Sequence, residues 1–201
     1  MKDLYVGLMS GTSMDGIDAV LARFSSTRIE ILATHSRPYP ADLQRALLEA
    51  IRKPLSEELD SSGELNSRVG NCFRDAAQKV ILDSGVDRNN IRAIGSHGQT
   101  LRHQPDAENP FSMQVGDPQI IAGGTNITTV ANFRQADIAA GGQGAPLVPP
   151  FHEWMFRSPE VDRAVVNIGG IANITILPAD DTAISGFDTG PGNGLMDAWV
   201  R

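Results

Sequence analysis

The chain has 201 residues, a net charge of −7 and one cysteine, Cys72. A single cysteine excludes an internal disulfide and a cysteine-based metal cluster, and the acidic balance without a basic cluster argues against a nucleic-acid partner. No apolar run approaches the ~18 residues that a membrane span needs. The first residues lack the apolar region of a signal peptide. We therefore expect a cytoplasmic protein with no membrane partner.

Three short apolar runs open the chain and predict strands at 4–9, 17–24 and 28–35. The short loops between them favour an antiparallel meander. In the third run, Ile29, Ile31 and Ala33 alternate with the other residues. This alternation predicts a half-buried strand on which these three side chains share one face.

Two stretches with apolar residues at helical spacing follow, at 43–51 and 65–80. Gly63 and Gly70 weaken the second helix by up to ~1 kcal/mol each if they lie inside it. A buried strand is then expected at 91–96. We thus expect two helices between the meander and the fourth strand.

The second half of the chain changes in character. Residues 109–151 carry three charges and six glycines, a pattern typical of the wall of a binding site and also of a buried connection. Further elements are expected beyond it. They are a helix over 146–157 that starts at Pro146, strands at 164–168 and 171–177 joined at Gly169-Gly170, a strand at 184–187, and a terminal helix that starts at Pro191.

Five segments place small or polar residues between these predicted elements. They are Met9–Asp18, Gly95–Thr100, Asn132–Arg134, Asn167–Asn173 and Phe187–Asn193. Small residues in the first segment let backbone N–H groups and hydroxyls approach an anion, although an ordinary hairpin turn has the same composition. It is not a Walker A loop, because Ile17-Asp18 stand where lysine and serine or threonine are required. Gly169-Gly170 in the fourth segment can face a phosphate or form a type I′ turn.

Polar side chains in the other segments also have two interpretations each. His97 and Gln99 suit recognition of a polyhydroxylated ligand, but a lone histidine is more often a satisfied core or surface residue. Arg134 needs an anionic ligand or a carboxylate such as Asp137. Asp188 precedes the predicted terminal helix, so it is either a base kept ionised by the helix N-terminus or a plain N-cap.

In this one order, the five segments resemble the anhydro-N-acetylmuramic acid kinase family along the whole chain. The resemblance implies the α/β fold of sugar kinases, Hsp70 and actin, in which two ribonuclease H-like lobes, each with a mixed sheet flanked by helices, surround a cleft. A cluster of glycines and prolines at 141–150 predicts a domain boundary near 141–162, so we expect a first lobe at 1–145 and the start of a second at 146–201. Family members are nearly twice as long, so we expect the second lobe to be truncated here and activity to belong to the longer protein.

The resemblance also implies a reaction. An ATP-dependent sugar kinase opens the 1,6-anhydro ring of 1,6-anhydro-N-acetylmuramic acid with water and phosphorylates the 6-oxygen. The products are N-acetylmuramic acid 6-phosphate and ADP, in peptidoglycan recycling. The implied partners are ATP, the anhydro-amino-sugar, Mg²⁺ held through phosphates and water rather than by a protein metal site, and a second copy in a homodimer.

Site residues follow from the same resemblance. Asp188 corresponds to the catalytic base. The ATP phosphates would contact Gly11, Thr12, Ser13, Met14, Asp15, Gly16, Ile17 and Asp18 from the first lobe and Gly169 and Gly170 from the second, with Asp15 or Asp18 near Mg²⁺. The sugar would lie toward His97, Gln99, Arg134 and Thr189.

Two other functions remain open from the sequence. The chain could be an inactive truncated fragment or a non-catalytic sugar-binding module of the same fold, and sugar binding without nucleotide binding would favour the module. Ser96 beside His97 suggests a serine hydrolase, although the G-x-S-x-G spacing is not met. Labelling of Ser96 by a fluorophosphonate would favour that function.

Overall fold

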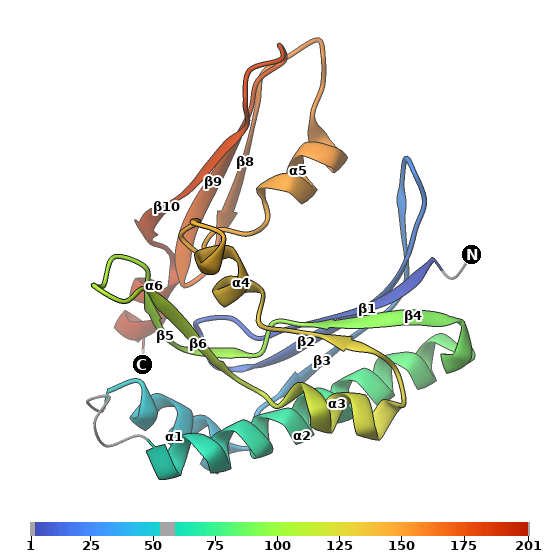
Figure 1. Cartoon of the computed structure of the whole chain (residues 1–201), viewed down its shortest axis with the longest axis vertical. Helices are drawn as coiled ribbons and strands as arrows, with labels where there is room; N and C mark the ends of the chain where they lie inside the picture. Colours follow the sequence, from blue (N-terminus) through green and yellow to red (C-terminus); the bar gives the residue numbers. More distant parts are fainter. Residues whose placement is uncertain (1–2, 53–58, 201) are drawn as a thin grey trace. The chain divides into compact units, whose positions relative to one another are not determined.

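The computed structural model describes residues 3–52 and 59–200. The chain divides into two compact units, Met1–Phe133 and Arg134–Arg201 (Figure 1). The lobe boundary expected at residues 145–146 lies inside the second unit, and it stays a prediction.

The first unit is built on a five-stranded sheet with the order β3-β2-β1-β4-β7. Its strands are β1 (Leu4–Met9), β2 (Gly16–Phe24), β3 (Ile29–Pro38), β4 (Ile91–Ser96) and β7 (Thr129–Val130). The first three form the predicted antiparallel meander, and β4 runs parallel to both β1 and β7. With helices flanking this mixed sheet (Figure 1), the predicted α/β class is confirmed.

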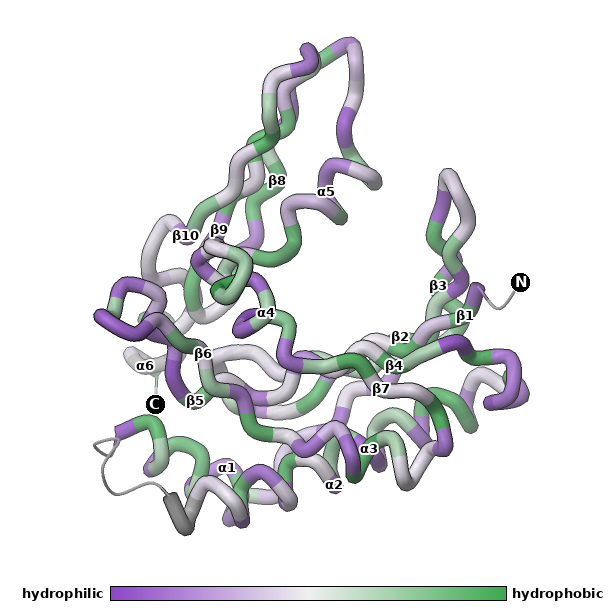
Figure 2. Tube along the Cα trace, in the orientation of Figure 1, coloured by the Kyte–Doolittle hydropathy of each residue, from purple (hydrophilic) through white to green (hydrophobic). Residues whose placement is uncertain are grey.

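The first unit also contains three helices, α1 (Ala41–Ala50), α2 (Leu59–Ser84) and α3 (Pro118–Thr125), and a short 3-10 turn, η2 (Arg88–Asn90). The predicted apolar stripe of α2 is buried in the core, with Val69, Phe73, Ala76 and Val80 all fully buried. Figure 2 shows apolar and polar residues interleaved along α1 and α2, as an amphipathic helix requires. Helical periodicity therefore located both helices.

Gly70 lies inside α2, where the sequence suggested it as a weakness. A Cβ at this position would come within 2.9 Å of the backbone nitrogen of Asp117, the N-cap of α3. The missing side chain therefore lets α3 pack directly on α2. Glycine lowers the stability of a helix, but only a residue without a Cβ allows this close approach.

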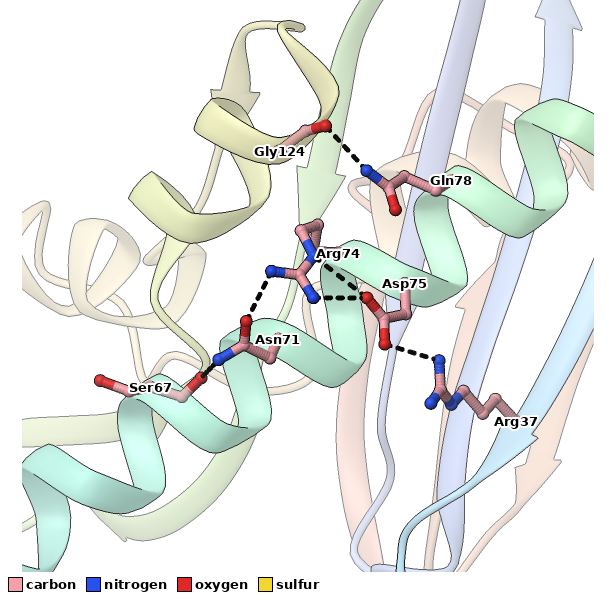
Figure 3. A network of polar contacts seen from close by, with 7 residues as sticks. All are labelled: Arg37, Ser67, Asn71, Arg74, Asp75, Gln78 and Gly124. Atoms are coloured by element: carbon pink, nitrogen blue, oxygen red, sulfur yellow. Dashed lines mark hydrogen bonds and ion pairs between the residues drawn. The ribbon is translucent and has the colours of Figure 1, made fainter.

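A polar network joins β3, α2 and α3 (Figure 3). Asp75 of α2 accepts hydrogen bonds from Arg37 of β3 at 2.9 Å and from Arg74 at 2.7 Å. Gln78 donates to the carbonyl of Gly124 in α3 at 2.8 Å. These groups are only half-buried, so the network fixes the direction of the elements more than it adds stability.

The predicted alternation of β3 is wrong in its middle. Ile31 is 61% exposed, whereas Leu32, expected on the other face, packs against the core with Ala33. The cause is a register shift opposite Leu21 and Ala22, which leaves Leu32 without a paired partner. A bulge of this kind reverses the faces of the residues on either side of it.

A two-stranded antiparallel sheet follows β4 and was not predicted. It consists of β5 (Gln99–Gln104) and β6 (Phe111–Val115). The register shifts between Thr100 and Arg102. Leu101 and Val115 are buried in the core of the first unit.

The second unit contains an antiparallel sheet in the order β10-β9-β8. Its elements are α4 (Phe133–Ala139), α5 (Pro149–Phe156), β8 (Arg163–Ile168), β9 (Ile171–Leu177), β10 (Ser185–Pro191) and α6 (Asn193–Val200). The predicted hairpin between β8 and β9 is confirmed. It is not a type I′ turn, since neither Gly169 nor Gly170 is among the described glycines with positive φ.

Two predicted helix starts are wrong. The helix expected from Pro146 begins at Pro149, which together with Pro150 fills its first two positions. The terminal helix begins at Asn193 rather than Pro191, because β10 continues through Asp188 and Pro191 pairs with Ile171. Asp188 is consequently a strand residue, and neither the N-cap nor the helix N-terminus accounts for it.

Candidate functional site

The loop at residues 10–16 joins β1 to β2 at the edge where β1 and its parallel neighbour β4 both end. The backbone N–H of His97, just after β4, donates to the carbonyl of Leu8 at 3.0 Å. The loop and the turn at residues 97–98 therefore lie next to each other. Ligands of open α/β sheets bind beyond the carboxyl ends of parallel strands, so this edge is the natural candidate site of the first unit.

Met14 anchors the loop. Its side chain is 3% exposed and its φ is +52°, an unusual conformation for a residue with a side chain. Its backbone N–H donates to the carbonyl of Gly11 at 3.3 Å, and its own carbonyl accepts from Gln44 of α1 at 3.0 Å. Buried side chains hold the loop in a defined shape, since Ile17 is also only 1% exposed.

The two glycines of this loop have different surroundings. A Cβ on Gly16 would lie 2.4 Å from the carbonyl oxygen of Arg37, because β2 and β3 pair closely here. A Cβ on Gly11 would meet only the hydroxyl of Ser13, at 3.9 Å. Packing explains the glycine at 16, whereas the space at Gly11 is open and could admit a ligand.

Asp15 and Asp18 are exposed carboxylates at the end of this loop. Asp15 accepts a hydrogen bond from Ser13 at 2.8 Å, and Asp18 accepts one from Ser36 at 2.6 Å. Carboxylate oxygens are hard ligands of the kind Mg²⁺ prefers, usually with several waters retained. Either carboxylate is therefore a ligand of the kind that a hydrated magnesium ion accepts. In the described part of the chain, no group of three or more His, Cys, Asp or Glu side chains could hold a metal by itself.

Gln99 and His97, both expected near the sugar, differ in accessibility. Gln99 is fully buried, with its amide hydrogen-bonded to Ser10 and Gly11 of the loop. His97 is half-buried, and its Nδ1 lies 2.8 Å from the carbonyl of Gly98. Ser96 is 1% exposed. A buried serine is not placed to act as a hydrolase nucleophile.

In the second unit, a polar row crosses the three-stranded sheet. Asn173 of β9 is directly opposite Asn167 of β8 and Asp188 of β10. Directly paired residues lie on the same face of a sheet, so the three side chains form one row. Asp188 is exposed, and the Oδ1 atom of Asn173 is buried with no hydrogen-bond partner among the described residues. The row presents a carboxylate next to an acceptor that can still take a hydrogen bond.

Arg134 and Asp137 of α4 both bind the backbone of Gly144. Arg134 Nη1 donates to the Gly144 carbonyl at 2.6 Å, and Asp137 accepts from the Gly144 N–H at 2.7 Å. Burial lowers the pKa of Arg134 from its usual range, and the nearby carboxylate of Asp188 opposes that shift. Arginine remains charged even so. The structure thus brings Arg134 and Asp188, predicted from distant segments, close enough to interact.

The Gly169-Gly170 turn packs against the start of α6. The N–H groups of Gly192 and Asn193 donate to the carbonyls of Gly170 and Gly169 at 2.9 and 2.8 Å. A Cβ on Gly192 would lie 2.3 Å from the Gly169 carbonyl oxygen. The hydroxyl of Thr189 donates to the Ala172 carbonyl at 3.1 Å. Close backbone packing accounts for part of the glycine content of this turn.

Three residues that contact the 10–16 loop or the surroundings of Asp188 were not predicted as site residues. Ser10 was within the first motif, but nothing in the sequence indicated its contact with Gln99. Asp137 was considered only as an ion-pair partner for Arg134. Asn173 was visible in its motif, and strand register would have placed it opposite Asp188 had β10 been predicted to its full length.

Comparison with known proteins decides the family. The profile of anhydro-N-acetylmuramic acid kinases matches residues 3–201. The chain belongs to the anhydro-N-acetylmuramic acid kinase family. Curated family members from Shewanella loihica and Vibrio vulnificus are each 50% identical over 200 residues, which is 100% of this chain and 54% of each relative. A member from Photobacterium profundum is 50% identical over 197 residues, 98% of this chain and 52% of that protein.

The chain thus spans about half the length of the curated kinases it matches. Among solved structures, a ROK hexokinase from Thermus thermophilus aligns with a TM-score of 0.39 and 15% identity, over 95% of this chain and 51% of that one. This likeness is too low to support a conclusion. Within residues 3–52 and 59–200, no helix combines the length and apolar composition of a membrane-spanning segment.

Proposed function

We propose that the protein containing this chain opens the 1,6-anhydro ring of 1,6-anhydro-N-acetylmuramic acid with water and transfers the γ-phosphoryl group of ATP to the 6-oxygen. Membership of the kinase family supports the reaction class. The observation that carries the assignment to this chain is the exposed carboxylate of Asp188, in a row with Asn173 and near the cation of Arg134. The products are N-acetylmuramic acid 6-phosphate, ADP and a proton. A cytoplasmic role in peptidoglycan recycling follows from these products, and a homodimer from the family resemblance.

Asp188 is the proposed general base. It accepts a proton from a water molecule, whose oxygen forms a bond to the anomeric carbon while the bond from that carbon to the 6-oxygen breaks. The freed 6-oxygen then attacks the γ-phosphorus, and ADP leaves with the electrons of the broken bond. An ionised, solvent-accessible carboxylate within hydrogen-bond reach of the water is what this step requires.

The loop at residues 10–16, here called the phosphate loop, is proposed to position the phosphates of ATP. Gly11, Thr12 and Ser13 are the accessible part of the segment, with backbone N–H groups and hydroxyls to stabilise phosphate charge. Met14 and Ile17 fix the shape of the loop through their buried side chains, and Gly16 through its close contact with β3. Gly169 and Gly170 form the corresponding turn of the second lobe. Asp15 or Asp18 would lie near Mg²⁺, which would neutralise the charge of the phosphates.

His97 of the first unit and, separately, Arg134 and Thr189 of the second unit stay predicted sugar contacts. Arg134 is held in place by Gly144 and is suited to a planar, charged or carbonyl-bearing group of the substrate. Thr189 follows the base directly in β10. Gln99 was also predicted near the sugar, but its complete burial favours a different role.

The test uses the intact gene product, incubated with ATP and the anhydro sugar, with the phosphosugar followed by mass. Turnover of ATP should require the sugar. Asp188→Asn should abolish turnover, because an amide cannot take the proton. Asp181→Asn, at another exposed aspartate of the same unit, is the matched control and should retain activity. Near-normal activity of Asp188→Asn would remove Asp188 as the base.

A non-catalytic sugar-binding module is the second candidate. Its support is that Asp188, Asn173 and Arg134 offer hydrogen-bonding groups suited to a sugar whether or not a nucleotide binds. Calorimetry on the 201-residue chain separates the two. Sugar binding without any ATP binding would favour the module for this segment, whereas binding of both would favour the kinase.

A further inference from the structure

Gln99 is the first residue of β5 and is 0% exposed. A primary amide buried to this extent must have its polar atoms paired. Its Oε1 accepts from the Ser10 hydroxyl at 2.7 Å. Its Nε2 donates to the carbonyl of Gly11 at 3.1 Å and, more weakly, to that of Thr100 at 3.4 Å. Both ends of the amide are therefore used inside the protein.

Ser10 extends this contact to the far end of the phosphate loop. Its hydroxyl is 2.6 Å from the carbonyl of Gly16 and 2.7 Å from Gln99 Oε1. A hydroxyl has one proton, so Ser10 shares it between these two acceptors. Ser10 is itself 2% exposed. The buried pair thus connects the first two residues of the loop to its last residue and to β5.

A side chain that is fully buried and fully hydrogen-bonded cannot reach a sugar without breaking those bonds. We infer that Gln99 is a positioning residue that, together with Ser10, holds the phosphate loop in the conformation that binds ATP, and that it does not contact the sugar. This inference rests on the proposed function, since it assigns a role within the same nucleotide site. The predicted contact of Gln99 with the sugar is thus replaced by its hydrogen bonds to Ser10 and Gly11.

The inference predicts which kinetic constant changes. Gln99→Met keeps the length of the side chain and removes the amide, so the carbonyl of Gly11 and the Ser10 hydroxyl each lose a partner. The loop then samples other conformations, and kcat/KM for ATP should fall roughly three- to tenfold, the effect of losing a typical hydrogen bond. KM for the sugar should not change. A direct sugar contact would give the opposite result.

Ser10→Ala provides an independent variant. It should lower kcat/KM for ATP in the same way, through a higher KM. Because the two residues act through one hydrogen-bonded unit, the double variant Ser10→Ala/Gln99→Met should lose much less than the product of the two single effects. Gln78→Met is the matched control, since its amide binds the carbonyl of Gly124 between α2 and α3, outside the loop. It should leave KM for ATP unchanged.

The experiment measures KM for ATP and for the anhydro sugar, together with the Kd for ATP by calorimetry without sugar, on the intact gene product and these variants. Wild-type turnover reports on the proposed function, and the ATP Kd reports on Gln99 even if no turnover occurs. A raised ATP Kd in Gln99→Met and Ser10→Ala, with the sugar KM unchanged, supports the inference. An unchanged ATP Kd, additive single effects or a raised sugar KM alone would overturn it, as would a wild-type protein that does not bind ATP.

Discussion

Replacing either of the two glycines of the 10–16 loop by alanine should have a different effect, on thermal stability at Gly16 and on ATP binding at Gly11. In Gly16→Ala, the new Cβ would lie 2.4 Å from the carbonyl oxygen of Arg37 and 2.9 Å from the Cα of Pro38. Both neighbours are backbone atoms of β3, so no side chain can rotate away. Restoring ordinary contact of 3.4 Å requires β2 and β3 to separate by about 1 Å at a paired position.

The cost of this separation can be estimated. Overpacking of this kind typically destabilises a protein by about 1–3 kcal/mol, and each kcal/mol lowers Tm by ~2–4 °C in a domain of 150–250 residues. Gly11→Ala adds a Cβ whose nearest neighbour is 3.9 Å away, so Tm should stay within a degree or two of wild type. If the loop binds ATP, the same methyl group should still raise KM for ATP, because it stands where the phosphates approach the backbone.

The assay is thermal unfolding of the intact gene product and both variants, followed by KM for ATP. We expect Gly16→Ala to lower Tm by several degrees and Gly11→Ala to change KM without changing Tm. Equal Tm values for the two variants would refute the interpretation that β3 packing requires the glycine at 16. A normal KM for ATP in Gly11→Ala would instead remove the open face of the loop as the phosphate site.

Two further predictions concern the second unit. Asn173→Asp would place a carboxylate directly opposite Asp188; because like charges at paired strand positions repel, Tm and turnover should both fall, and a fully active variant would contradict the polar row. Burial lowers the pKa of His152 below its usual 6.5, so the stability of its neutral form is present above about pH 6.5 and is lost as the pH falls toward the folded-state pKa. The Tm of the wild type should therefore drop more steeply between about pH 7 and 5 than that of His152→Gln, and parallel curves would exclude this residue as a source of acid sensitivity.

The elements of the first unit that periodicity could locate were those with one uniformly buried face. The stripe through Val69, Phe73 and Val80 predicted α2, because each of these residues lies against the sheet. The same method failed at β3, where one unpaired residue, Leu32, reverses the alternation. Period-two patterns carry no information about a bulge, since its position is set by the partner strand.

The β5–β6 hairpin was missed for a related reason. Its first strand, β5, contains one apolar residue, Leu101, among polar ones, so its sequence lacks the alternation that predicts a strand. The end of β10 was missed because Asp188, Thr189, Gly190 and Pro191 have the composition of a turn before a helix. Gly190, with φ of +133°, lies in the irregular part of that strand and allows Pro191 to pair with Ile171.

The candidate site was predictable as a set of segments and not as a set of roles. Sequence motifs brought His97, Gln99 and the 10–16 loop under one functional hypothesis, but the spacing of Gln99 from Ser10 along the chain gave no reason to expect their hydrogen bond. Side chains of one type differ in role according to burial. A half-exposed His97 can meet a ligand, whereas a fully buried Gln99 can act only on its protein neighbours.

Glycine content leads to the same distinction. The 20 glycines of this chain suggested backbone approach to phosphates, and Gly11 has the open surroundings that such approach requires. Gly16 and Gly192, in contrast, are separated from neighbouring backbone carbonyls by less space than a methyl group occupies. Two of these three positions are therefore explained by strand and helix packing beside the site. A glycine in these motifs can therefore be required either by the ligand or by close packing of the neighbouring backbone. The space at its Cβ position distinguishes the two causes.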